Sequence, residues 1–148
     1  MTERELTAKR KAELRKIEQE NGGLLRPEAV VDFARNPKTA LHDVFDWNDT
    51  TAAASWRLQQ ARAFIRVMVQ IMPDPRSNDE PLRVRMYTAL REDAEGYKYT
   101  PELMTTKAGR ESVLATALAE LESFQEKYAH LQELAGVFAE CKRLRAAV

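Results

Sequence analysis

The chain has 148 residues, of which 44% are hydrophobic and 31% charged, a composition that indicates one globular domain and excludes a disordered protein. Lys+Arg and Asp+Glu number 23 each, so the formal net charge is zero, which excludes a protein that coats nucleic acid by bulk positive charge but permits a local basic face. The single cysteine excludes an internal disulfide and a cysteine zinc cluster. We expect a cytoplasmic location and no membrane association, because the N-terminal segment lacks the apolar core of a secretory signal and no run approaches the roughly 18 apolar residues of a membrane span.

The first predicted element is a charged helix over residues 2–20. Thr2 and Glu5 have the spacing of a capping box, in which each side chain bonds a free backbone N–H of the first turn. The sequence Asn21-Gly22-Gly23 predicts its end, because asparagine and glycine tolerate the left-handed conformation that follows many helices. Six basic and five acidic residues lie within residues 1–20, and this balance favours a solvated helix over a phosphate-binding arm.

Residues 24–65 are predicted to be helical in three pieces. Pro27 suits the first position of a short helix that runs to residue 35, and residues 39–45 have room for one or two more turns. A longer helix is expected over residues 50–65, with Asn48 or Asp49 as its N-cap and Trp47 as a hydrophobic staple on its first turn. The apolar face of this helix is wide, and we expect Trp56 to anchor it in the core.

Residues 66–100 change from a helical to an alternating periodicity. Apolar β-branched residues alternate with longer side chains over residues 66–72, and Arg83 and Arg85 alternate with Leu82 and Val84. A short third strand is expected at residues 97–100. These segments predict an antiparallel meander of two or three strands, which needs helices on one face to be stable.

From residue 107 onward the pattern is helical to the end. Apolar residues recur at alternate spacings of three and four, and this heptad-like seam comprises Leu114, Ala117, Leu121, Phe124, Tyr128, Leu131, Ala135 and Phe138. One long helix and a pair of helices broken near residues 128–130 both fit the pattern. Because the seam is too apolar for an isolated helix, it must cover the sheet, pack on the 50–65 helix or pair with another copy.

Together these elements predict an α+β fold that is mostly helical. We expect a single domain over residues 1–148, with a charged N-terminal helix (1–23), a helical part (24–65), a β-meander (66–100) and a C-terminal helix or helical pair (107–148). Zero net charge gives little self-repulsion and so permits self-association, and the apolar seam leads us to expect a homo-dimer or higher oligomer. The predicted oligomer or partner interface consists of Leu114, Leu121, Phe124, Tyr128, Leu131 and Phe138.

No group of residues in the sequence is typical of catalysis or of a metal site. His42 could act as a base beside Asp43 or Asp46, but a histidine in such a place more often packs at a helix end. The sequence contains no phosphate-binding glycine loop and no nucleophile elbow. We therefore expect a protein that is not an enzyme and that uses no cofactor and no metal.

Short helices, a longer helix and then a hairpin follow one another as in a winged helix-turn-helix protein, in which the long helix enters the major groove and the hairpin lies against the DNA backbone. Ser55 and Gln59, with the arginines beside them, offer donors suited to base edges and phosphates. The predicted nucleic-acid-binding residues are Arg57, Arg62, Arg66, Arg83 and Arg85. The open alternative is an ordinary solvated arginine face on a helix that is mostly buried.

Short stretches along most of the chain carry a resemblance to a known class of proteins. They are Leu25-Arg-Pro-Glu-Ala-Val-Val31, Leu41-His42, Phe45-Asp-Trp47-Asn-Asp49, Ala52-Ala53, Gln60-Ala-Arg62, Val84-Arg-Met-Tyr87, Ala119-Glu-Leu121 with Phe124, Lys127-Tyr128 and Val137-Phe138. In this pattern the chain resembles a recurrent class of small proteins of tailed bacteriophages and prophages. The resemblance implies a viral or integrated-element origin, and so a bacterial host cytoplasm, but it transfers no activity and no catalytic residue.

Two functions remain open at this point. One is a phage accessory protein, not an enzyme, that binds DNA as an oligomer for regulation or genome handling. The other is a protein–protein adaptor or inhibitor that acts on a host or virion component through the C-terminal helices.

Overall fold

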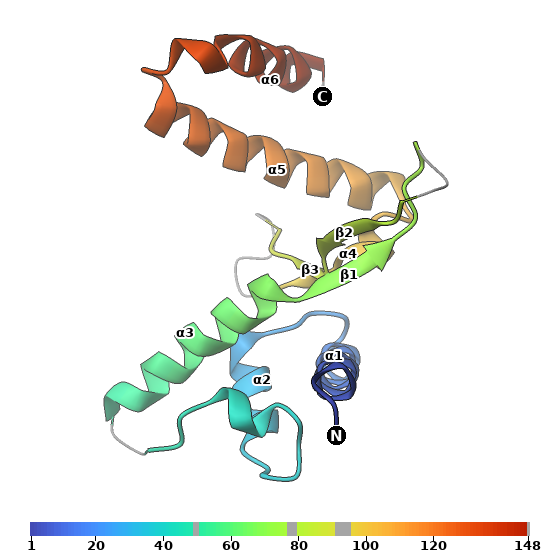
Figure 1. Cartoon of the computed structure of the whole chain (residues 1–148), viewed down its shortest axis with the longest axis vertical. Coiled ribbons are helices and arrows are strands. Elements are labelled where there is room, and N and C mark those ends of the chain that lie inside the picture. Colours follow the sequence, from blue (N-terminus) through green and yellow to red (C-terminus); the bar gives the residue numbers. More distant parts are fainter. Residues whose placement is uncertain (49–50, 77–79, 91–95, 148) are drawn as a thin grey trace. The chain divides into compact units, whose positions relative to one another are not determined.

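The computed structural model describes residues 1–48, 51–76, 80–90 and 96–147 (Figure 1). The chain forms two compact units, Met1–Leu103 and Met104–Val148, and the single domain stays a prediction. The predicted α+β, mostly helical fold is confirmed, since helices make up most of the described chain and the strands form two small antiparallel sheets.

The N-terminal helix α1 (Glu3–Glu20) begins and ends where the sequence predicts. Thr2 and Glu5 form the predicted capping box. At the other end, Gly22 and Gly23 have φ of 69° and 82°, the left-handed region that glycine adopts without steric cost. A short helix, α2 (Pro27–Ala34), follows with Pro27 in its first turn, as predicted.

The expected helix at residues 39–45 is reduced to the short 3-10 helix η1 (His42–Val44). The main chain pairs in tight turns here, because the amides of His42, Val44 and Phe45 each bond the carbonyl three residues back. The carboxylate of Glu13 on α1 accepts hydrogen bonds from the main-chain amides of Ala40 and Leu41 at 2.8 and 2.9 Å. Main-chain bonds to the carbonyl three residues back close 3-10 turns, which stay short because their geometry is poorer than that of an α-helix.

The long helix α3 (Thr51–Val67) extends two residues beyond its predicted end. Ala61 and Ile65 are fully buried, whereas Trp56 is 58% exposed, so the prediction that Trp56 anchors the core is wrong. Trp56 and Ile65 are nine positions apart, which places them on opposite sides of a helix with about 3.6 residues per turn. The buried side of α3 is thus the part of its wide apolar face that carries Ala61 and Ile65. The predicted N-cap position Asp49 lies outside the described residues.

Two hairpin-like pairs replace the expected continuous meander. Strand β1 (Val69–Met72) pairs antiparallel with β2 (Leu82–Arg85), and β3 (Tyr87–Thr88) pairs antiparallel with β4 (Lys98–Tyr99). Met86 separates the two sheets and joins them, because its main chain bonds the carbonyl of Met68 and the amide of Thr100, each at 2.9 Å. The first unit then ends in the short helix α4 (Thr100–Leu103).

The core of the first unit lies between α1, α2, α3 and the strands. Its buried hydrophobic residues are Leu14, Ile17, Leu25, Val30, Val31, Ala34, Leu41, Phe45, Ala61, Ile65, Met68, Met86 and Tyr87. An isolated bridge between Leu25 and Tyr97 connects the start of α2 to this core. The small β3–β4 sheet therefore packs against helices through Tyr87 and Tyr99, as a small sheet requires for stability.

The second unit is a helical pair. It consists of α5 (Lys107–Tyr128), the short 3-10 helix η2 (Gln132–Leu134) and α6 (Ala135–Ala147). The break falls where the sequence allows one, just after Tyr128. Thr106 caps α5 by accepting a 3.0 Å hydrogen bond from the amide of Gly109.

Candidate nucleic-acid interface

The end of α3 and the β1–β2 hairpin are held together by main-chain bonds. The amide of Met86 donates to the carbonyl of Met68 at 2.9 Å, and the register places Val69 opposite Arg85 and Ile71 opposite Arg83. Arg66 is three residues before Val69, and consecutive Cα atoms are about 3.8 Å apart. Val69 lies about 5 Å across the hairpin from Arg85. The Cα atoms of Arg66 and Arg85 are therefore at most roughly 16 Å apart. The backbone positions of these arginines therefore lie near one another on a connected helix and hairpin.

Four of the five predicted arginines are accessible. Arg66, Arg83 and Arg85 are exposed, and Arg62 is half-buried. Arg83 and Arg85 share one face of the hairpin because side chains alternate along a strand, and Ile71 on the same face is 60% exposed. We call the group Arg62, Arg66, Arg83 and Arg85 the arginine surface.

Arg57 does not belong to this surface. Its side chain is only 3% exposed. Its guanidinium donates a 3.2 Å hydrogen bond to the main-chain carbonyl of Asp46 and lies 5.3 Å from the centroid of the Trp47 ring. Arg57 therefore holds the segment before α3 against the helix, and the prediction that it contacts DNA is wrong.

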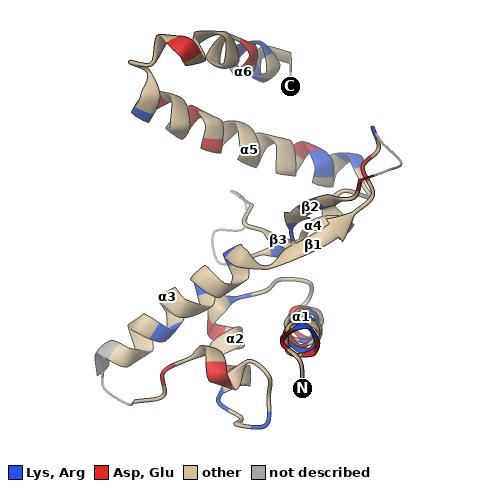
Figure 2. Cartoon of the chain, in the orientation of Figure 1, with Lys and Arg blue, Asp and Glu red and all other residues tan. Residues whose placement is uncertain are grey.

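The elements that carry the arginine surface contain no acidic residue. Residues 51–73 and 81–90 include no Asp or Glu, and in Figure 2 α3 and β2 show blue segments, β1 is tan, and none of the three is red. The acidic residues nearest to these strands in sequence, such as Asp74, belong to the loop that connects β1 to β2. These elements therefore contribute only positive charge.

The exposed side of α3 adds polar and aromatic groups. Ser55, Trp56, Gln59 and Arg66 are exposed, and spacings of three, four, seven and eleven place them on one side of a helix. Sequence reasoning missed Trp56 as a surface residue. The signal that could have found it is its position opposite Ala61 and Ile65 around the helix.

A second charged group lies inside the first unit and is structural. The Arg15 guanidinium forms an ion pair with Glu18, a second with Glu102 at 3.1 Å, and lies 3.7 Å from the centroid of the Tyr99 ring. Burial raises the pKa of the Glu18 carboxyl, and the Arg15 charge opposes that rise. Burial also raises the pKa of Tyr87, beside the same group. These contacts join α1 to β3, β4 and α4.

His42 is placed by packing. Its ring stacks on Trp47 with centroids 5.1 Å apart, and its Nδ1 lies 2.8 Å from the carbonyl oxygen of Ala34. The Trp47 indole N–H donates to the carbonyl of His42 at 3.0 Å. Among the described residues, no group of three His, Cys, Asp or Glu side chains is placed to hold a metal ion.

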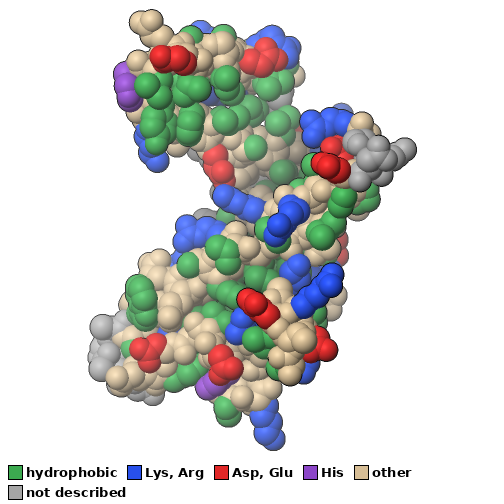
Figure 3. All heavy atoms as spheres, viewed as in Figure 1, with side chains coloured by type: hydrophobic (Ala, Val, Ile, Leu, Met, Phe, Trp, Pro, Cys, Tyr) green, Lys and Arg blue, Asp and Glu red, His purple; other side chains and the backbone are tan. Residues whose placement is uncertain are grey.

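The predicted interface residues of the second unit divide into two sets. Leu114, Leu121, Phe124, Tyr128 and Leu131 are exposed by 38–44%. Phe138 is only 9% exposed, and its ring lies 6.3 Å from that of Phe124, so it belongs to the contact between α5 and α6. Hydrophobic side chains gather over these two helices on the surface seen in Figure 3.

No family model, curated protein or solved structure matches this chain. Within the described parts of the chain, no helix is long and apolar enough to cross a membrane.

Proposed function

We propose that this chain is an accessory protein of tailed phages or prophages, not an enzyme, that binds double-stranded DNA through the arginine surface. Its role would lie in regulation or genome handling in the cytoplasm of a bacterial host. The observation that carries the proposal is the acid-free combination of α3, β1 and β2, which holds Arg62, Arg66, Arg83 and Arg85 as one group.

The electrostatic part of this function suits the arginines. Each Lys or Arg that neutralises a DNA phosphate releases a condensed counterion, which gives affinity without sequence preference. The zero net charge of the chain means that this attraction must be local. The arginine surface is the local feature that meets this need, and the hairpin arginines suit contacts with the DNA backbone.

The exposed side of α3 supplies groups that could read bases. Gln59 can donate to and accept from adenine in the major groove, and arginine can donate to guanine. Trp56 adds apolar contact area beside them. In this arrangement α3 lies in the groove while Arg83 and Arg85 contact phosphates, as in winged helix-turn-helix proteins.

The test is an anisotropy titration of a labelled duplex with the full chain in low salt. Charge reversal by Arg66→Glu with Arg83→Glu is expected to weaken binding at least about tenfold, which corresponds to ~1.4 kcal/mol. The matched control is Arg4→Glu with Lys38→Glu, two exposed cations outside the arginine surface. Equal losses in both variants, or no binding by the wild type, would count against the proposal.

A second candidate function is favoured by the exposed apolar residues of α5, which suit an adaptor or inhibitor that binds a host or virion protein. It predicts no DNA affinity. It also predicts a specific partner that is lost when Leu121 and Phe124 are made polar while the fold survives.

A further inference from the structure

The second unit buries little of its own apolar surface. Among its described residues, Leu118, Phe138 and Cys141 are the buried hydrophobic side chains, whereas Leu114, Leu121, Phe124 and Tyr128 are 38–44% exposed. A pair of helices of fewer than about 50 residues with so small a core is not stable alone. The exposed apolar side of α5 therefore requires cover.

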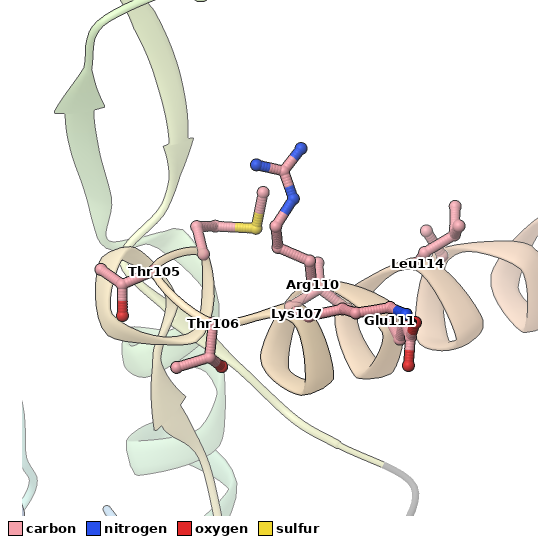
Figure 4. A pocket seen from close by; sticks show the side chains of 9 residues that line it. Thr105, Thr106, Lys107, Arg110, Glu111 and Leu114 are labelled. Carbon is pink, nitrogen blue, oxygen red and sulfur yellow. Dashed lines mark ion pairs between the residues drawn. The ribbon is translucent and has the colours of Figure 1, made fainter.

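The helix α6 covers only the C-terminal half of α5. Phe138 contacts Phe124, and the Arg145 guanidinium bonds the Glu122 carboxylate at 3.0 Å. The helix α6 has 13 residues against 22 in α5. An open groove of about 680 Å³ lies along the other half of α5, where Arg110 and Leu114 project from the same side of the helix (Figure 4).

We propose that a second copy of the chain covers this side of α5, with the two α5 helices antiparallel and related by a two-fold axis near residue 119. A two-fold interface must be self-complementary, so that residue i meets residue j and j meets i. The exposed seam has this property. The axis pairs Arg110 with Tyr128, Leu114 with Phe124 and Ala117 with Leu121 of the second copy.

The paired side chains also fit in chemistry and size. A guanidinium at residue 110 can lie over the ring of Tyr128, a cation–π contact. The small Ala117 leaves room for Leu121, and Leu114 and Phe124 bring large apolar groups together. An unrelated partner would not need the seam to complement itself in this way, which is why we favour a second copy.

The charges along α5 favour the antiparallel direction. Residues 107–117 carry Lys107, Arg110 and Glu111, a net charge of two minus one, or +1. Residues 118–128 carry one lysine and three glutamates; because Glu122 is paired with Arg145 of α6, the remaining charge is one minus two, or −1. Antiparallel helices bring the positive half of one copy against the negative half of the other, whereas parallel helices would bring like charges together.

The first measurement is the mass of the full chain in solution by sedimentation or light scattering over the micromolar range. The wild type is expected to be a dimer, and Leu121→Glu is expected to raise the dimer dissociation constant by at least about tenfold. Ala115→Glu is the matched control, because residue 115 is also exposed on α5 but lies about 100° around the helix from Leu114. A monomeric wild type would overturn the proposal and leave the face to another protein or to the rest of the chain. The dimer does not depend on DNA binding.

The second measurement fixes the direction of the helices. With Cys141→Ala as background, Leu114→Cys and Phe124→Cys proteins are oxidised separately and as a mixture, and circular dichroism checks that each is folded. In antiparallel helices, residue 114 of one copy meets residue 124 of the other, whereas residue 114 of one copy lies about 15 Å from residue 114 of the other. The arrangement therefore predicts a disulfide-linked dimer mainly in the mixture of the two proteins. Efficient cross-linking of the Leu114→Cys protein alone would overturn the proposed arrangement.

Discussion

The Arg57 guanidinium lies 5.3 Å from the centroid of the Trp47 ring and bonds the main-chain carbonyl of Asp46 at 3.2 Å. Because Arg57 is only 3% exposed, its replacement should affect folding and not DNA affinity. Arg57→Ala removes a buried hydrogen bond and a cation–π contact, and we expect a loss of about 2–3 kcal/mol in the free energy of unfolding.

The exposed Arg66 on the same helix is the matched comparison for Arg57. Arg66→Ala is expected to change stability by less than about 0.5 kcal/mol but to weaken DNA binding. Urea unfolding and a DNA titration of both variants separate the two roles. Loss of DNA affinity in a stable Arg57→Ala protein would contradict the assignment of Arg57 to the fold.

The ion pair of Arg15 with the buried Glu18 predicts an asymmetry between its two partners. Arg15→Ala leaves the Glu18 carboxylate, which is 2% exposed, without its main cation, and should cost about 3–5 kcal/mol. Glu18→Gln keeps the shape, removes the charge and should cost less. Lys16→Ala, which breaks an ion pair between exposed partners one residue away, should cost at most about 1 kcal/mol. Chemical denaturation would measure all three, and equal losses for Arg15 and Lys16 would count against a buried pair.

Burial of Glu18 also predicts a pH dependence. Its folded-state pKa is raised above the unfolded value by burial, so the folded protein binds the proton more tightly. The resulting stabilisation is complete below the unfolded pKa of about 4.3 and is lost as pH rises through the folded pKa. Glu18→Gln should therefore become more stable relative to the wild type as pH rises from about 4 to 7. Unfolding free energies that run parallel over this range would refute the assignment.

Two glycines should respond to alanine in opposite directions. A Cβ at Gly96 would lie 2.9 Å from the carbonyl oxygen of Leu25 and 2.7 Å from Cγ of Leu24, whereas nothing lies within 4 Å of a Cβ at Gly136 in α6. Gly96→Ala should cost about 1–3 kcal/mol by overpacking, and Gly136→Ala should stabilise its helix by about 1 kcal/mol. Thermal unfolding followed by circular dichroism checks both signs, and a destabilised Gly136→Ala protein would show that α6 is packed on that side too.

Local signals predicted the helices well. The capping box of Thr2 and Glu5, the glycines after α1 and Pro27 at the start of α2 act through neighbouring backbone groups, so the sequence alone specifies them. The heptad spacing likewise predicted helix in α5 and α6, and it allowed the break that the structure places after Tyr128.

Features that depend on distant residues could not be predicted in this way. The apolar face of α3 is wide, and only the packing of α3 against α2 and the rest of the core decides that Ile65 is buried and Trp56 exposed. The burial of Glu18 could not be predicted because it depends on how α1 packs in the core. Its partner Arg15 also contacts Tyr99 and Glu102, which lie more than 80 residues further along the chain. The candidate site was predicted in part, because alternation placed Arg83 and Arg85 on one face while no local pattern showed that Arg57 bonds Asp46.

The salt dependence of DNA binding tests the central claim most directly. Log affinity for a duplex should fall linearly with log salt, with a slope of about −0.9 for each neutralised phosphate. The variant with Arg66→Gln and Arg83→Gln should reduce the slope by about 2, because two phosphate contacts are lost. The variant with Arg4→Gln and Lys38→Gln should leave it unchanged. Absence of wild-type binding at ~50 mM salt, or a slope that the first variant does not change, would contradict a DNA-binding role for the arginine surface.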